Sequence, residues 1–323
     1  MGQPGCVELL QSSLATNTWK KYGSAIKHWF SFCSTLRIDP LINHPPCILA
    51  DFISHTFYSS KASLSSISTS IAAIKKLWTV HGHPITAFES ELVQSVLKGA
   101  RNLVAQTHKP SKHRLAMSLN ALHIAGHVIN KKTEWPAIDR HTFWCLLLTC
   151  FWGVFRVGDL VSTHARTISS KCLTWGCVKF EDNKVFIRTR TPKYSKDPRG
   201  EVRTLCPHED KRICPVTWLQ IIRTSHPNPD DPVFRYKSKV LITVAQVSNI
   251  LKSVTELIKP PDNSGFSAHS LRAGIPSVMA ARPDVFTRQE ILHSGGWHSN
   301  AMDRYTRSSV AIAEATAVKL HKS

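Results

Sequence analysis

The sequence predicts a mainly α-helical protein with a small antiparallel β-sheet, divided into two domains. Three observations lead to this prediction. Apolar residues recur every three or four positions over most of the 323-residue chain, as they do in amphipathic helices. Residues 174–205 instead alternate apolar and polar side chains around turn residues, which is typical of strands. A short basic segment containing proline, residues 108–116, separates a first domain at 16–107 from a second at 117–323, and residues 1–15 form a weakly ordered lead-in.

The first domain contains four predicted helices. The first begins near residue 16, where three polar residues offer an N-terminal cap, and its apolar side includes Trp19, Ile26 and Trp29. The other three cover residues 48–56, 63–81 and 89–105, with breaks at prolines and a glycine. Few strand signals occur here, so we expect a small all-helical domain.

The charge of the chain indicates a polyanionic partner. It carries 41 Lys and Arg against 22 Asp and Glu, a formal net charge of +19 with a pI near 9.8. We expect this partner to be nucleic acid rather than a membrane surface, because no basic amphipathic helix or polybasic block is present. The predicted phosphate contacts of the first domain and the linker are Lys20, Lys21, Lys27, Lys61, Lys75, Lys76, Lys98, Arg101, Lys109, Lys112 and Arg114.

Other bulk features exclude several classes of protein. No apolar run reaches the roughly 18–20 residues that span a bilayer, and the start of the chain lacks the pattern of a secretory signal. The nine cysteines are odd in number and scattered, which favours reduced thiols over a disulfide framework. We therefore expect a protein that is neither secreted nor inserted in a membrane.

The second domain is predicted to begin with two helices, the second of which, residues 137–153, is apolar on all sides and therefore buried. Arg156 follows it directly, with Asp159 three residues later. The alternative interpretation of this pair is a simple helix ion pair. Because Arg156 follows a buried helix, we instead expect it to be held rigidly.

A basic β region comes next. Strands are predicted at 174–180, 184–190 and 201–205, and the first two flank a turn at 181–183. The second strand carries Arg188 and Arg190 as candidate DNA contacts, and the basic turn after it carries Lys193 and Lys196. Further helices are predicted from Pro215 and over 244–258.

The most informative stretch is residues 267–307. Ser267 is a candidate cap for a helix that places His269 and Arg272 on one face of its first turns, and such a helix start suits a phosphate. Gly295, Gly296 and Trp297 follow, and Tyr305 comes after a second candidate cap at Ser299. A phenol beside cationic groups is a candidate nucleophile, because positive charge favours the phenolate. The chain ends in an Ala-rich amphipathic helix.

The ordered set Arg156, Lys196, His269, Arg272, Trp297 and Tyr305 resembles the catalytic residues of the tyrosine recombinase (phage integrase-like) family. Lys193 is the competitor for Lys196, and His298 for Trp297, although the eight-residue spacing to Tyr305 favours Trp297. Asp159 would orient Arg156, in place of the more common Glu. The phrase HSLRAG and the Trp at the fifth position look most like the eukaryotic mobile-element recombinases of the DIRS, Ngaro or Crypton type.

The resemblance implies a fold and an activity. The first domain would be a helical (SAM-like) core-binding domain and the second an α+β catalytic domain. The chain would be a site-specific recombinase or integrase of a mobile element that cleaves and rejoins DNA through a 3′-phosphotyrosyl intermediate. The partner would be double-stranded DNA, and four protomers would act on two duplexes. The terminal helix would dock on its own domain or on a neighbouring protomer. The location would be the nucleus in a eukaryote and the cytoplasm otherwise.

Alternatives remain at this stage. One is a type IB topoisomerase-like relaxing enzyme, and another is a catalytically idle DNA-binding descendant of a recombinase. An RNA-binding helical protein is less consistent with the sequence, because aromatic-rich strands are missing. A zinc site is suggested by Cys206, His208 and Cys214, perhaps with Cys172 and Cys177, but the spacing lacks the usual paired ligands, so we expect no metal and no cofactor.

Overall fold

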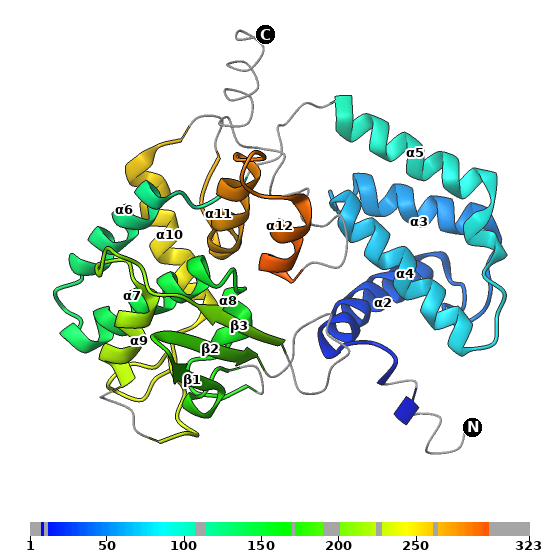
Figure 1. Cartoon of the computed structure of the whole chain (residues 1–323). Helices are drawn as coiled ribbons and strands as arrows, with labels where there is room; N and C mark the ends of the chain where they lie inside the picture. Colours follow the sequence, from blue (N-terminus) through cyan, green and yellow to red (C-terminus); the bar gives the residue numbers. More distant parts are fainter. Residues whose placement is uncertain are drawn as a thin grey trace, which may run out of the picture. The chain divides into compact units, whose positions relative to one another are not determined.

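The computed structural model describes residues 8–9, 12–106, 114–169, 172–189, 201–223, 228–260 and 264–296 (Figure 1). The chain divides into two compact units, residues 1–109 and 110–323. Each unit has its own hydrophobic core, so each is described by itself.

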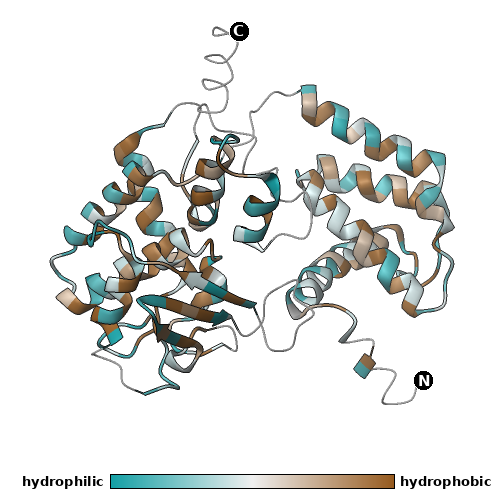
Figure 2. Cartoon of the chain, in the orientation of Figure 1, coloured by the Kyte–Doolittle hydropathy of each residue, from teal (hydrophilic) through white to brown (hydrophobic). Residues whose placement is uncertain are grey.

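The N-terminal unit is all-helical in its described part. Its elements are α2 (Thr16–Leu36), α3 (Pro46–Tyr58), α4 (Leu64–Val80), the 3-10 turn η1 (Thr86–Glu89) and α5 (Glu91–Gln106). The helices alternate hydrophilic and hydrophobic stretches along their length (Figure 2). Their apolar sides bury an aromatic core. The ring of Trp29 packs edge-on against that of Phe52 with 5.2 Å between the ring centroids, and the centroids of Trp78 and Phe88 are 4.8 Å apart.

The four predicted helices are confirmed, with small differences at their ends. Ser63 caps α4 as expected, accepting a hydrogen bond from the Ser66 amide at 3.1 Å. The predicted polar cap of α2 is wrong, because the N-cap residue is Ala15 and makes no side-chain bond. The start expected at residue 89 belongs to η1, and α5 begins two residues later.

The helices of the C-terminal unit surround α7 (Ala137–Trp152), which is buried along most of its length. Helices α6, α9 and α11 all contact it. The bounds of the others are α6 (Leu119–Asn130), α8 (Val157–Leu160), α9 (Pro215–Arg223), α10 (Val244–Ile258), α11 (Ala268–Ala280) and α12 (Arg288–Gly295). Helix α12 was not predicted from the sequence.

The three strands form one antiparallel sheet in the order β1 (Val178–Glu181), β2 (Lys184–Thr189), β3 (Glu201–Leu205). The β1–β2 turn uses two residues with positive φ, Asp182 and Asn183, as tight hairpins require. The first strand begins four residues later than predicted. Residues 175–177 form a 3-10 turn instead, because the amides of Trp175 and Gly176 bond to the carbonyls of Asp231 and Pro229.

Candidate phosphate-binding site

Arg156 is held at the junction between α7 and α8. Helix α7 ends at Gly153, and Val154 then adopts a left-handed conformation with φ of 53°, which is rare for a β-branched residue. Arg156 is the N-cap residue of α8 and forms an ion pair with Asp159 at 3.5 Å. Its side chain is 28% exposed. The predicted pair therefore forms, and the guanidinium remains accessible at the surface of the unit.

Helix α11 begins where the sequence predicts. The Ser270 hydroxyl accepts a hydrogen bond from the Ser267 amide at 2.9 Å, which fixes the first turn. His269 and Arg272 follow, the first partly buried and the second 1% exposed. Gly274 then allows close packing, since a Cβ at this position would meet the ring of Phe151 and lie 2.6 Å from the Met117 carbonyl oxygen.

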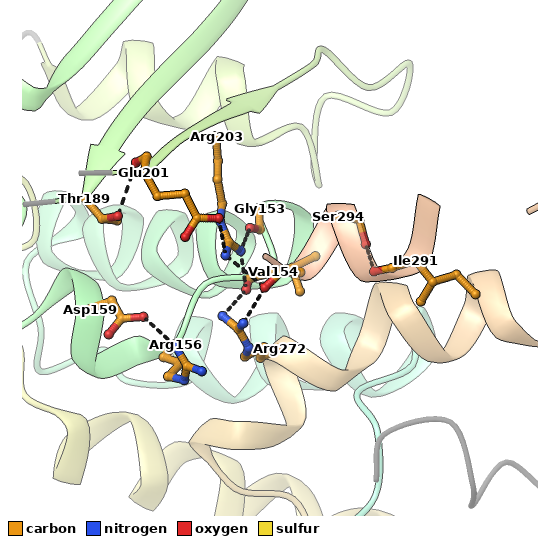
Figure 3. A network of polar contacts seen from close by, with 11 residues as sticks. Gly153, Val154, Arg156, Asp159, Thr189, Glu201, Arg203, Arg272, Ile291 and Ser294 are labelled. Atoms are coloured by element: carbon orange, nitrogen blue, oxygen red, sulfur yellow. Dashed lines mark hydrogen bonds and ion pairs between the residues drawn. The ribbon is translucent and has the colours of Figure 1, made fainter. Parts of the chain in front are cut away.

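Arg272 is surrounded by backbone carbonyls. Its Nη1 donates to the Val154 oxygen at 2.8 Å (Figure 3). Its Nη2 donates to the Gly295 oxygen. Through Arg272, helix α11 is hydrogen-bonded both to the turn before Arg156 and to the end of α12. The sequence predicts that Arg272 is available to bind a phosphate, but in this structure its guanidinium is buried and bonded to the protein itself.

Arg203 on β3 is a second buried arginine that sequence reasoning missed. It donates to the same two carbonyls as Arg272, those of Val154 (Figure 3) and Gly295, and its side chain is 10% exposed. Glu201 pairs with it at 2.9 Å. A signal was present in the sequence: Glu201 and Arg203 share a strand face with the buried Leu205, which is an unusual place for charges.

His269 lies in an electropositive environment. Burial first, and then the cations Arg114, Arg272 and Arg156, lower the pKa of its imidazole to about 4. The ring is therefore neutral near pH 7 and can accept a proton or a hydrogen bond. The same positive charges that disfavour a proton on His269 also attract an anion to this place.

Arg114 belongs to this site rather than to a separate linker contact. It forms a parallel bridge with Gly265, and the Leu115 amide donates to the Gly265 carbonyl at 3.1 Å. The Met117 amide donates to the Ser270 carbonyl at 2.9 Å. This short segment therefore runs along the start of α11, and its exposed arginine lies close enough to act on His269.

Helix α12 carries the chain to the edge of the site. Its αL residue Gly296, with φ of 59°, lies against the Glu201–Arg203 pair. Several predicted site residues follow or lie elsewhere outside the described residues: Trp297, His298, Tyr305, Lys193, Lys196, Arg190, Lys109 and Lys112.

The remaining predicted DNA contacts occupy the surfaces of both units. Lys20, Lys21 and Lys27 are exposed on α2, and Arg188 is exposed on β2. Lys75 and Lys76 are partly buried on α4, and the Lys75 ammonium lies 5.3 Å from the centre of the Phe88 ring.

Two further observations concern metal and membrane. Among the described residues, no group of three or more His, Cys, Asp or Glu is placed to hold a metal ion. His208 and Cys214 instead take part in local hydrogen bonds, the ring accepting from the Asp210 amide and the sulfur from the His208 amide. No helix in the described part of the chain is long and apolar enough to cross a membrane.

The fold is that of solved DNA recombinases. A Tn1549 transposon integrase in complex with transposon right end DNA matches with a TM-score of 0.61 and 11% identity, over 95% of each chain. XerH site-specific recombinase bound to difH substrate matches with a TM-score of 0.59 and 16% identity, over 92% of this chain and 78% of that one. A lambda integrase dimer bound to a COC′ core site matches with a TM-score of 0.55 and 14% identity, over 91% of this chain and 89% of that one. The sequence itself matches no protein-family model and no curated protein.

Proposed function

We propose that this chain is a site-specific DNA recombinase or integrase that acts through a tyrosine–phosphate link. The observation that carries the proposal is the convergence of Arg156, His269 and Arg272 at the start of α11, in a fold shared with DNA-bound recombinases. Helix α12 ends at Gly295, and Trp297 and Tyr305 follow two and ten residues later in the chain. Guanidinium and imidazole groups at a helix start suit a phosphodiester.

The reaction follows from these groups. The Tyr305 phenol oxygen attacks the scissile phosphorus, and neutral His269 accepts its proton. The phosphorus–5′-oxygen bond breaks, and Lys196 or Lys193 protonates the leaving oxygen. Arg156 and Arg272 stabilise the charge on the non-bridging oxygens, and Trp297 donates its indole N–H or packs the site. A 5′-hydroxyl then gives up its proton and attacks the phosphorus of the phosphotyrosine. The phosphorus–Tyr305 oxygen bond breaks and the phenol oxygen takes back the proton held by His269, so rejoining needs no external energy source.

Arg272 must change its surroundings for this role. Its guanidinium is bonded to the carbonyls of Val154 and Gly295. Contact with a phosphate therefore requires a rearrangement around these carbonyls. We propose that DNA binding produces it, because a phosphate is a stronger acceptor for guanidinium than a neutral carbonyl.

The finer assignments rest on the resemblance. The first unit would act as the core-binding domain and clamp the duplex together with the second, with the basic segment 108–116 between them. Four copies would act on two duplexes. The phrase HSLRAG favours an origin in a DIRS, Ngaro or Crypton-like mobile element, and then a nuclear location.

The test uses a nicked duplex carrying a candidate terminal sequence of the element. Wild-type protein, Tyr305→Phe and the control Tyr58→Phe, whose ring is exposed in the other unit, are mixed with it and run on a denaturing gel. We expect a covalent band for the wild type and the control that survives EDTA. We expect Tyr305→Phe to bind DNA without forming it.

The same samples separate the other candidate functions. Strand exchange between two sites supports a recombinase, whereas relaxation of supercoiled DNA without exchange supports a topoisomerase-like enzyme. Binding on several sites without a covalent band contradicts the proposal and favours an idle DNA-binding protein.

A further inference from the structure

We infer that Arg203 is a positioning residue for the reaction proposed above, on which the inference rests: from β3 it holds in place the turn before Arg156 and the end of α12, without itself binding DNA. Its guanidinium bonds to Gly153, Val154 and Gly295, which are 50, 49 and 92 residues distant in sequence. The distances from Nη1 to the Gly153 and Val154 oxygens are 2.9 and 2.7 Å, and that from Nη2 to the Gly295 oxygen is 3.0 Å. All three acceptors belong to segments that contain or precede predicted reaction groups.

The guanidinium of Arg203 is held in place by the side chains around it. Glu201 Oε1 accepts from both its Nε, at 3.1 Å, and its Nη2, at 2.9 Å, and the Phe155 ring lies 5.0 Å from the guanidinium carbon. Burial lowers the pKa of Arg203, and Glu201 opposes this effect, yet a guanidinium keeps its charge. With its donors directed at protein acceptors, Arg203 acts on the fold rather than on a phosphate.

The first segment that Arg203 holds is the turn before Arg156. Val154 is left-handed and β-branched, a conformation that costs of order 1–3 kcal/mol and persists only where its surroundings impose it. The Val154 carbonyl lies between Arg203 and Arg272, and both donate to it (Figure 3). Removing Arg203 therefore removes part of what fixes the direction of Arg156.

The second segment is the end of α12, which leads into Trp297. Arg203 and Arg272 share the Gly295 carbonyl, and a Cβ on Gly296 would lie 2.9 Å from Arg203 Nη2. Arg203 itself lies on β3, which begins at Glu201. Arg203 thus connects β3 to both the turn before Arg156 and the end of α12.

The experiment compares wild type, Arg203→Met, Arg203→Lys and Arg235→Met in the full chain. Arg235 is the matched control, since it is also an arginine with a mostly buried side chain, 15% exposed, paired with Asp231 at 2.6 Å in the same unit. Arg203→Lys keeps the charge beside Glu201 and so protects folding, but its ammonium lacks the fork that reaches three carbonyls. Each protein is tested for DNA binding, for hydrogen exchange of residues 153–156 and 292–296, and for single-turnover cleavage.

Cleavage is measured on two nicked duplexes that differ at the scissile position, one with an ordinary phosphate and one with a neutral methylphosphonate. A misplaced Arg156 or Arg272 slows the charged substrate, because these groups neutralise the non-bridging oxygens. We expect both Arg203 variants to cleave the phosphate about 100-fold more slowly than wild type, with unchanged DNA binding and a much smaller loss on the methylphosphonate. Arg235→Met should change neither rate.

The outcomes are distinct. Equal losses on both substrates, or a loss of DNA binding that matches the loss of rate, overturn the positioning role. The positioning role is also overturned if residues 153–156 and 292–296 exchange their amide hydrogens in the Arg203 variants at the wild-type rate. If wild-type protein forms no covalent product on either duplex, the proposed function fails, while hydrogen exchange still decides whether Arg203 holds these segments.

Discussion

At the scale of single residues, the site combines exposed and buried cations with different roles. Arg156 and Arg114 are accessible, whereas Arg203 and Arg272 are buried and bonded to carbonyls. His269 lies among them with a depressed pKa. The site is therefore electropositive and carries one group that is neutral near pH 7, the combination that accepting a proton from a phenol beside a phosphate requires.

The depressed pKa of His269, about 4, predicts a pH-dependent stability. Between about pH 6.5 and pH 4 the unfolded chain binds a proton that the folded chain does not, so acidification through this window destabilises the fold. His269→Gln removes this effect, and its unfolding midpoint in urea should fall less than that of wild type between pH 7 and pH 4.5. The control is His81→Gln at an exposed site in the other unit, which should follow wild type. An identical acid loss in His269→Gln would contradict the assignment.

At the scale of elements, the position of α11 depends on its approach to α7 at Gly274. A Cβ there would overlap the Phe151 ring and crowd the Met117 carbonyl, so Gly274→Ala should shift the helix that carries His269 and Arg272. Overpacking of this kind lowers the free energy of unfolding by about 1–3 kcal/mol. We expect this loss to appear in thermal unfolding, together with a slower rate of DNA cleavage. Gly99→Ala is the control, because its Cβ would meet nothing within 4 Å on α5 and should stabilise by up to about 1 kcal/mol. Cleavage at the wild-type rate in Gly274→Ala would show that α11 tolerates the shift.

The sequence predicts the long helices and the strands β2 and β3 well but misses the short helix α12, for physical reasons. Periodicity identified α4 and α10 because each buries an apolar stripe, whereas α7 was identified because it is apolar on all sides. Helix α12 was missed because its eight residues bury only Ile291 and Gly295, which gives almost no periodic signal. The contacts of Arg203 with distant segments were missed because those partners are backbone carbonyls, which have no sequence signature, although its place on a strand face with the buried Leu205 was a signal.

At the scale of the whole molecule, the excess of cations predicts an affinity for DNA that falls steeply with salt. Each phosphate contact made by a lysine releases a counterion, and the logarithm of the binding constant falls with the logarithm of salt concentration by about 0.9 per contact. Lys20, Lys21 and Lys27 are exposed on α2. If all three contact phosphates, replacing them with Gln should reduce that slope by about 3 and weaken binding similarly on every sequence.

The control for this prediction removes the same number of positive charges elsewhere. Lys131, Lys132 and Lys252 belong to the C-terminal unit and were not among the predicted DNA contacts, so changing them to Gln lowers the net charge equally. Fluorescence anisotropy on labelled duplexes over a range of salt concentrations gives both slopes. A larger effect for the α2 triple variant assigns the N-terminal unit to the DNA backbone, because the change in overall charge is identical. Equal slopes in the two variants would mean that the charge of the chain acts only as a diffuse field, and that α2 makes no phosphate contact.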